Sequence, residues 1–320
     1  MNKTARILGS SSPKLVKTLG WKYANLCGCK AVEDLSTNHG LSISKKKLQC
    51  VNEALGSVLA DKEGKWTYAD PVLEEEVSSI GISRDGTTTL IKGERYRETM
   101  AGTISLYNQA GNRLHTIYTG CAPEYGKATF DYVFSQEIER IQIKYQNATY
   151  VGIADGSKDN WSFLQDYTSI QTIDYWHVCE YLADYSKVVY SNQQERDQWQ
   201  KDSYHKLKHE SGAAEQLLEE MKNYAHAHSL ADNVNPVSKS ITYFENNKSK
   251  MEYAKNLEMK LPIGSGVVEA ACKTLVKQRL SKSGCRWTIN TVDDMLMSRA
   301  LIMTGDRWSQ FWKKVDRYGY

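Results

Sequence analysis

Two acidic residues stand at points where a carboxylate can take part in chemistry. Asp85 closes the strand-like run VSSIGISRDGTTTL, and Asp155 closes the run ATYVGIADGSKDNW. In both runs an apolar alternation gives way to an Asp-Gly pair, which predicts that the strand ends there. Binding and catalytic sites of open sheets lie at strand ends. A hairpin turn is the common alternative for Asp-Gly, but it fits Asp155 poorly because a helix-like segment follows.

A third acidic residue, Glu269, lies in the stretch LPIGSGVVEAACKTLVKQRLSKSGCRW, residues 261–287. Apolar residues at helical spacing after its glycine-containing loop predict a helix with one face toward a core. On an α-helix Glu269, Lys273 and Lys277 would share one row. This row is either a solvated face with a Glu–Lys pair or a metal-binding carboxylate beside a phosphate-binding strip.

Composition sets the limits for any function. The chain has 320 residues, 41% hydrophobic and 25% charged, as expected of a soluble protein of about two domains with a sizeable core. Its formal net charge is only +3, so a DNA-binding face would have to be a local patch. Seven cysteines without a C-x-x-C pair favour free thiols in a reducing compartment. With no signal peptide and no membrane-spanning apolar run, we expect a cytoplasmic protein.

Residues 1–66 predict three short helices. The first starts at Ser12-Pro13, the second covers Lys30 to Thr37, and the third follows a glycine-containing turn and ends at Gly56. Such an order is typical of a helix-turn-helix; a small helical packing domain is the alternative. The side chains at the start of the third helix that would meet phosphates and base edges are Lys45, Lys46, Lys47 and Gln49.

From residue 77 the sequence changes to a strand period. Three strand-like runs predict an antiparallel meander with turns at Asp85-Gly86 and 109–111, and a helix should start at Pro123-Glu124. A strand, a short helix and another strand then complete a mixed α/β sheet. The predicted strands cover 77–84, 97–107, 112–119, 148–154 and 169–174. Residues from His177 to about Lys255 are helical and polar, and they separate Asp155 from Glu269 in sequence.

Several segments carry a resemblance to a known family. They are RDGTTT, ETMAGTISLYN, LHTIYTGCAPEYGKATF, ATYVGIADGSKDNW, IDYWHVCEYL, YHKLKHESGAAE and IGSGVVEAACKTLVKQRLSKSGCRW. On these segments, which cover most of residues 77–312, the sequence resembles DDE-type transposases of bacterial insertion sequences, in the ISKra-type group near the Mutator-like branch.

The resemblance implies a ribonuclease-H-like α/β core with a mixed five-stranded sheet, an all-helical insertion and an N-terminal helix-turn-helix domain. The domains expected on this basis are residues 1–66 for DNA binding, 77–180 and 259–320 for the two parts of the catalytic core, and 181–258 for the insertion. The implied activity is binding of the element's terminal inverted repeats, followed by metal-dependent DNA strand cleavage and strand transfer. The expected partners are double-stranded terminal and target DNA and further copies of the chain on paired ends, without a membrane, in the nucleoid region of a bacterial cytoplasm.

The resemblance also assigns site residues. It implies that Asp85, Asp155 and Glu269 hold two Mg²⁺ ions, for which Mn²⁺ substitutes, because in-line displacement at phosphorus uses two divalent ions. Asp174 and His177 of IDYWH match a C/D-x-x-H signature and are expected to organise the site. A hydrogen-bonded histidine at a strand-to-helix junction is the alternative for His177.

The segment around Glu269 is also basic, which suits neutralisation of a DNA backbone. The expected contacts are Lys273, Lys277, Arg279, Lys282 and Arg286. Trp287 either stacks on an unpaired base or anchors the next helix in the core. Two other functions remain open: a catalytically silent, truncated copy that only binds DNA, and a ribonuclease-H-like nuclease acting on RNA or branched DNA.

Overall fold

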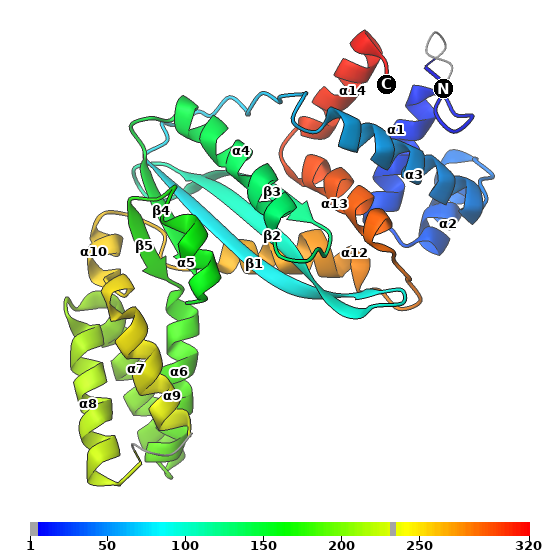
Figure 1. Cartoon of the computed structure of the whole chain (residues 1–320). Coiled ribbons are helices and arrows are strands. Elements are labelled where there is room, and N and C mark those ends of the chain that lie inside the picture. Colours follow the sequence, from blue (N-terminus) through cyan, green and yellow to red (C-terminus); the bar gives the residue numbers. More distant parts are fainter. Residues whose placement is uncertain (1–5, 231–234) are drawn as a thin grey trace.

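The computed structural model describes residues 6–230 and 235–320, and a five-stranded mixed sheet lies at its centre (Figure 1). Its strands are β1 Ser79–Ile91, β2 Arg95–Tyr107, β3 Arg113–Cys121, β4 Thr149–Ala154 and β5 Ile170–Ile173. They lie in the order β3-β2-β1-β4-β5; β1, β4 and β5 run parallel, whereas β2 pairs antiparallel with both β1 and β3. The predicted mixed α/β sheet is therefore confirmed, and its order is compatible with a ribonuclease-H-like fold.

Helices cover both faces of the sheet because its strands carry apolar residues on both sides. One face packs against α4 (Ala128–Lys144) and α5 (Lys158–Leu164), where a Cβ on Gly102 of β2 would lie only 2.8 Å from the ring of Phe134. The other face packs against a helical segment that bears Glu269 and against the next helix along the chain. These elements are α11 Gly266–Ala271, a π-helix Cys272–Lys277, α12 Gln278–Leu280 and α13 Ile289–Met303.

The N-terminal helices pack against the C-terminal ones (Figure 1). Their bounds are α1 Pro13–Asn25, α2 Gly28–His39, α3 Lys45–Lys62 and α14 Arg307–Tyr318. Gly40, with φ of 62°, ends α2, and the Ser44 side chain caps α3, as the helix-turn-helix pattern predicts. Gly56 does not end α3, contrary to the prediction. Gly56 lies inside the helix. Packing explains why this residue is a glycine, because the Asp294 side chain of α13 occupies the space that a Cβ would fill.

A helical bundle projects from the sheet between β5 and α11, as the sequence predicts (Figure 1). Its helices are α6 Tyr175–Val189, α7 Gln193–His209, α8 Ala213–Ala227 and α9 Pro236–Asn247, followed by a 3₁₀ turn Lys248–Lys250 and α10 Tyr253–Glu258. Leu182, Leu217 and Phe244 are buried inside it and belong to the same apolar core as the α4–α5 face of the sheet. Where one domain ends and the next begins stays a prediction.

Two further local predictions are wrong. Asp85-Gly86 is not a turn: both residues pair with β2, and β1 continues to Ile91. A Cβ on Gly86 would clash with the Glu98 carboxylate, so a larger residue there would have to displace this exposed side chain. The helix expected at Pro123-Glu124 begins only at Ala128, because the Glu124 carboxylate accepts hydrogen bonds from backbone N–H groups of its first turn.

All seven cysteines are free thiols, as expected. None of the helices in the described ranges is long and apolar enough to cross a membrane.

Candidate active site

The register of the sheet brings Asp85 and Asp155 together. Ser83 of β1 pairs with Ile153 of β4, and two residues farther along each parallel chain are Asp85 and Asp155. Asp85 is therefore inside a strand but just beyond the part of β1 that β4 covers. The negative charge of Asp155 contributes to raising the pKa of Asp85, as expected of neighbouring carboxylates.

The Asp85 carboxylate is partly buried on the face covered by the π-helix. Its Oδ1 accepts a hydrogen bond from the Gly86 N–H at 2.7 Å, and its Oδ2 lies 3.5 Å from the Cys272 thiol. Burial raises the pKa of Asp85, and the charges of Asp155 and Glu98 add to this, against the lowering effect of the two hydrogen bonds. The environment therefore disfavours the ionised form of Asp85, and a bound cation would stabilise that form.

Asp155 is exposed and is oriented by polar contacts. Its Oδ1 accepts hydrogen bonds from the Ser157 N–H at 3.1 Å and from Asn160 Nδ2 at 3.2 Å. Asn160 is in turn held by Arg84, whose Nε donates to its Oδ1 at 2.9 Å and which is only 1% exposed. The Tyr243 hydroxyl of α9 donates to the Asp155 carbonyl at 2.8 Å. The insertion therefore touches the backbone of a candidate catalytic residue.

Glu269 reaches the same region through a serine that precedes its helix. Its Oε1 lies 2.9 Å from Ser265 Oγ, and the Ser265 N–H donates to Asp174 Oδ2 at 2.6 Å. The Ser265 hydroxyl also contacts Asp174, and since it has one proton, it donates to one of the two carboxylates at a time. Burial raises the pKa of Glu269, the Ser265 hydrogen bond opposes this, and the charges of Asp174 and Asp85 raise it further.

Asp174 is fully buried and caps the N-terminus of α6. Its Oδ1 accepts hydrogen bonds from the backbone N–H groups of Trp176 at 2.6 Å and His177 at 3.1 Å. His177 itself lies with Nδ1 3.2 Å from Glu180 Oε2, and its ring packs edge-on against Tyr181 and Tyr243. Asp174 thus joins the insertion to the loop before Glu269, whereas His177 makes the local contacts of a junction residue.

The donor set suits a hard divalent cation, because all its ligands would be carboxylate oxygens. Within the described ranges, Asp155 Oδ2 and Glu269 Oε2 have no hydrogen-bond donor, so each has an oxygen free for a ligand. With the side chains as they stand, no three His, Cys, Asp or Glu residues of the described part form a group that could hold one metal ion.

Two predictions for the basic segment that follows Glu269 are wrong. The π-helix that starts at Cys272 changes the helical period, so Glu269 and Lys277 do not share the row expected of an α-helix. Arg279 is only 1% exposed, and its Nε donates to the Tyr23 carbonyl at 2.8 Å. It is therefore a core residue and not a DNA contact.

Trp287 is likewise a core residue, and the stacking role expected for it is wrong. Its ring is 4% exposed, its Nε1 donates to the Leu280 carbonyl at 3.0 Å, and the Arg279 guanidinium lies over it at 4.6 Å. The other predicted contacts of this segment are exposed: Lys273, Lys277, Lys282 and Arg286.

The predicted contacts on α3 lie apart from the carboxylates, on a helix that packs against α13 (Figure 1). Lys45, Lys46 and Gln49 are exposed. Lys47 is partly buried, and its ammonium group donates a hydrogen bond to the Gly9 carbonyl instead of facing solvent freely.

Sequence reasoning missed Ser265, Asn160 and Tyr243. Ser265 lies at the N-cap position of α11 in a Gly-Ser-Gly loop. This pattern predicts the start of a helix, but it does not predict the hydrogen bond from Ser265 to Asp174. Nothing in the local sequence marks Tyr243 as a partner of Asp155, 88 residues away.

No protein-family model matches the chain, and neither does any curated protein.

Proposed function

We propose that this chain is a DDE-type transposase that binds the terminal repeats of an insertion sequence and catalyses metal-dependent cleavage and transfer of DNA strands. The observation that carries the proposal is that Asp85 lies beside Asp155 in the register of the sheet and that its charge also acts on Glu269. The three carboxylates come from β1, from the end of β4 and from the helix after the insertion. The charge of Asp155 raises the pKa of Asp85, and the charge of Asp85 raises the pKa of Glu269. The strand order of the sheet agrees with the ribonuclease-H-like core that the resemblance implies.

In this proposal Asp85, Asp155 and Glu269 hold two Mg²⁺ ions. When bound, the ions would activate the attacking oxygen and stabilise charge on the leaving oxygen of an in-line displacement. The protein's part is to fix the carboxylates: Arg84 through Asn160 orients Asp155, and Asp174 through Ser265 orients Glu269. Water and then a DNA 3′-hydroxyl would be the nucleophiles, so no covalent protein intermediate is needed.

DNA would be held by exposed residues of two segments: the one that follows Glu269, and α3, which lies apart from the carboxylates. Lys273 and Lys277 follow Glu269 directly, and Arg286 lies on the loop after α12, so all three can neutralise backbone phosphates. Lys45 and Gln49 of α3 are the proposed contacts of the helix-turn-helix with the terminal repeat.

The test is cleavage of an end-labelled duplex that carries the repeats flanking the gene, in Mg²⁺ or Mn²⁺. The parent should nick the strand at the element's end, and Glu269→Gln should lose cleavage while it binds the duplex in Ca²⁺ with the parent's affinity. Glu258→Gln, which changes an exposed carboxylate of α10, is the matched control and should cleave normally. A parent that binds the ends in every metal but never cuts them contradicts the catalytic proposal.

A further inference from the structure

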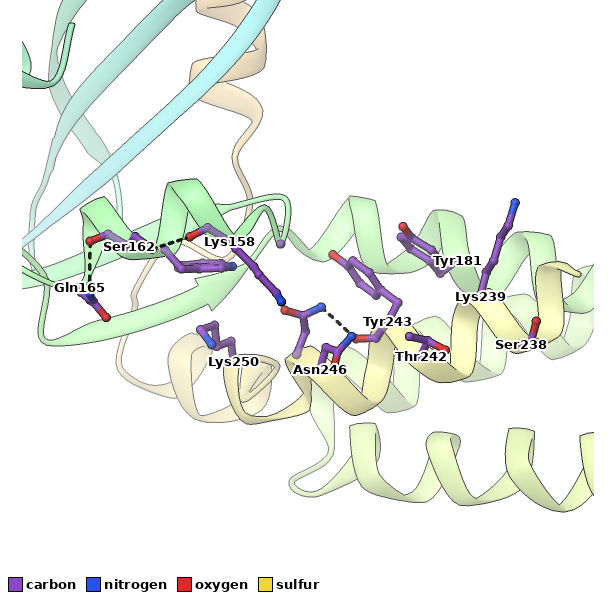
Figure 2. Close-up of a pocket in the computed structure, with 13 residues that line it drawn as sticks. Lys158, Ser162, Gln165, Tyr181, Ser238, Lys239, Thr242, Tyr243, Asn246 and Lys250 are labelled. Carbon is purple, nitrogen blue, oxygen red and sulfur yellow. Dashed lines mark hydrogen bonds between the residues drawn. The ribbon is translucent and has the colours of Figure 1, made fainter. Parts of the chain in front are cut away.

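A pocket of about 770 Å³ lies between the core and the insertion, beside Asp155 (Figure 2). It is formed by α5 and α9, and Gly156, the residue after Asp155, is part of its wall. Gly156 has φ of +102°, and a Cβ there would lie 3.1 Å from the Tyr243 ring. The volume of the pocket falls within the range of about 300–1,000 Å³ typical of small-ligand sites.

The pocket is positively charged. Lys158, Lys239 and Lys250 line it, and Figure 2 shows them coming from α5, from α9 and from the turn after α9. None of the three makes an ion pair with the described residues, and the lining contains no Asp or Glu. Other lysines nearby are paired, such as Lys127 with Asp159. Three unpaired ammonium groups in one pocket favour an anionic ligand.

The walls of the pocket are also aromatic. The Tyr181 and Tyr243 rings stack at 3.9 Å, and the Lys250 ammonium lies 5.2 Å from the Trp161 ring. Trp161 is 9% exposed, and its Nε1 is buried without a hydrogen-bond partner in the described structure. Trp161 thus contributes a mostly buried aromatic ring to the wall of the pocket.

Aromatic side chains, the amide of Asn246 and three unpaired lysines together fit a nucleotide, whose base stacks and whose phosphates are anionic. We infer that this pocket receives an unpaired nucleotide of the DNA strand next to the phosphate held at the carboxylates. A base inside a duplex is stacked on its neighbours and cannot reach such walls, so the strand must be locally open there. The inference rests on the proposed function for the identity of the strand, but the pocket's ligand can be tested separately.

The test is anisotropy of fluorescein-labelled (dT)₁₂ with the full chain in Ca²⁺, where cleavage is not required. The triple variant Lys158→Gln/Lys239→Gln/Lys250→Gln should bind about tenfold more weakly. Its log–log salt slope should be shallower by about 2, since each phosphate contact on a single strand contributes roughly 0.7. Lys201→Gln changes an exposed lysine of α7 outside the pocket and should bind like the parent.

A triple variant with the parent's affinity and salt slope overturns the inference. So does displacement of (dT)₁₂ by thymidine monophosphate or pyrophosphate at concentrations equal to the oligonucleotide's own Kd, which would make this a free-nucleotide or phosphate site. Placing 2-aminopurine at successive positions of the duplex used in the cleavage test, in Ca²⁺, should give a fluorescence change at one position near the scissile phosphate, and that change should be lost in the triple variant. If (dT)₁₂ binding depends on the lysines but the parent never cleaves DNA, the proposed function fails while the pocket inference stands.

Discussion

Asp174→Asn is the change whose effect can be worked out most directly from the structure. The Asp174 carboxylate is fully buried and accepts from the N–H groups of Trp176, His177 and Ser265 and from the Ser265 hydroxyl. An asparagine has one acceptor oxygen, so its NH₂ group must face either the start of α6 or Ser265. In both orientations at least one buried N–H loses its acceptor.

The loss has two parts. Leaving a buried donor unsatisfied costs about 1–3 kcal/mol, and removing a negative charge from the N-terminus of a helix costs about 0.3–1 kcal/mol. We therefore expect Asp174→Asn to lower the free energy of unfolding by about 1–4 kcal/mol. Asp184→Asn on the same helix removes an exposed carboxylate paired with Lys187, and should change it by less than about 1 kcal/mol.

Urea unfolding followed by far-UV circular dichroism measures both values, provided that the slope of free energy against urea is unchanged. Ser265→Ala, which keeps the backbone N–H donor to Asp174, should cost less than Asp174→Asn. If Asp174→Asn unfolds at the same urea concentration as the parent and Asp184→Asn, the carboxylate does not hold α6 to the loop before Glu269, and the reasoning is refuted.

Three further predictions concern other packed positions. Arg84→Lys should lower the free energy of unfolding by about 1–3 kcal/mol, because an ammonium cannot reproduce the bond from the guanidinium to Asn160; an unchanged thermal midpoint would contradict this. Gly56→Ala should cost about 1–3 kcal/mol by overpacking against α13, whereas Ser57→Ala on the exposed side of the same helix should be close to neutral in a urea titration. Burial raises the pKa of Asp294 to about 7, so its contribution to stability is present at low pH and is lost as pH rises through about 7. Asp294→Asn should therefore stabilise the protein at pH 8 but hardly at pH 4, and equal shifts in the thermal midpoint at both pH values would show that Asp294 is not the cause.

The sheet was predictable because its signal is local. The period-two runs mark all five strands, and the apolar residues that predicted the Glu269 helix, such as Val268, Leu275 and Val276, are buried. The errors come from contacts that no local pattern encodes. Asp85-Gly86 has turn chemistry, but pairing with β2 on both sides keeps it in the strand. Gly56 has the chemistry of a helix stop, but a distant side chain requires a glycine inside the helix.

The candidate site was predictable in its carboxylates but not in their supports. Asp85 and Asp155 stand out because each follows an apolar run, while the link from Ser265 to Asp174 joins residues 91 positions apart. Arg279 and Trp287 show the opposite case. In the sequence they belong to a basic and aromatic segment, but each has partners in the core that only the tertiary structure supplies.

Those supports explain how a helical bundle can stand between two parts of one site. The chain leaves the sheet at Asp174 and returns before Ser265, and the two points are bonded to each other directly and by the Tyr175 N–H to the Ile263 carbonyl at 3.0 Å. Glu269 is therefore positioned by the base of the bundle and not by its length. Among the hydrogen bonds that the described residues make with Asp85, Asp155 and Glu269, one comes from farther up the bundle. It joins the Tyr243 hydroxyl to the Asp155 carbonyl. A ligand that moves α9 would thus act on Asp155 through the Tyr243 hydrogen bond while leaving the Ser265–Glu269 contact in place.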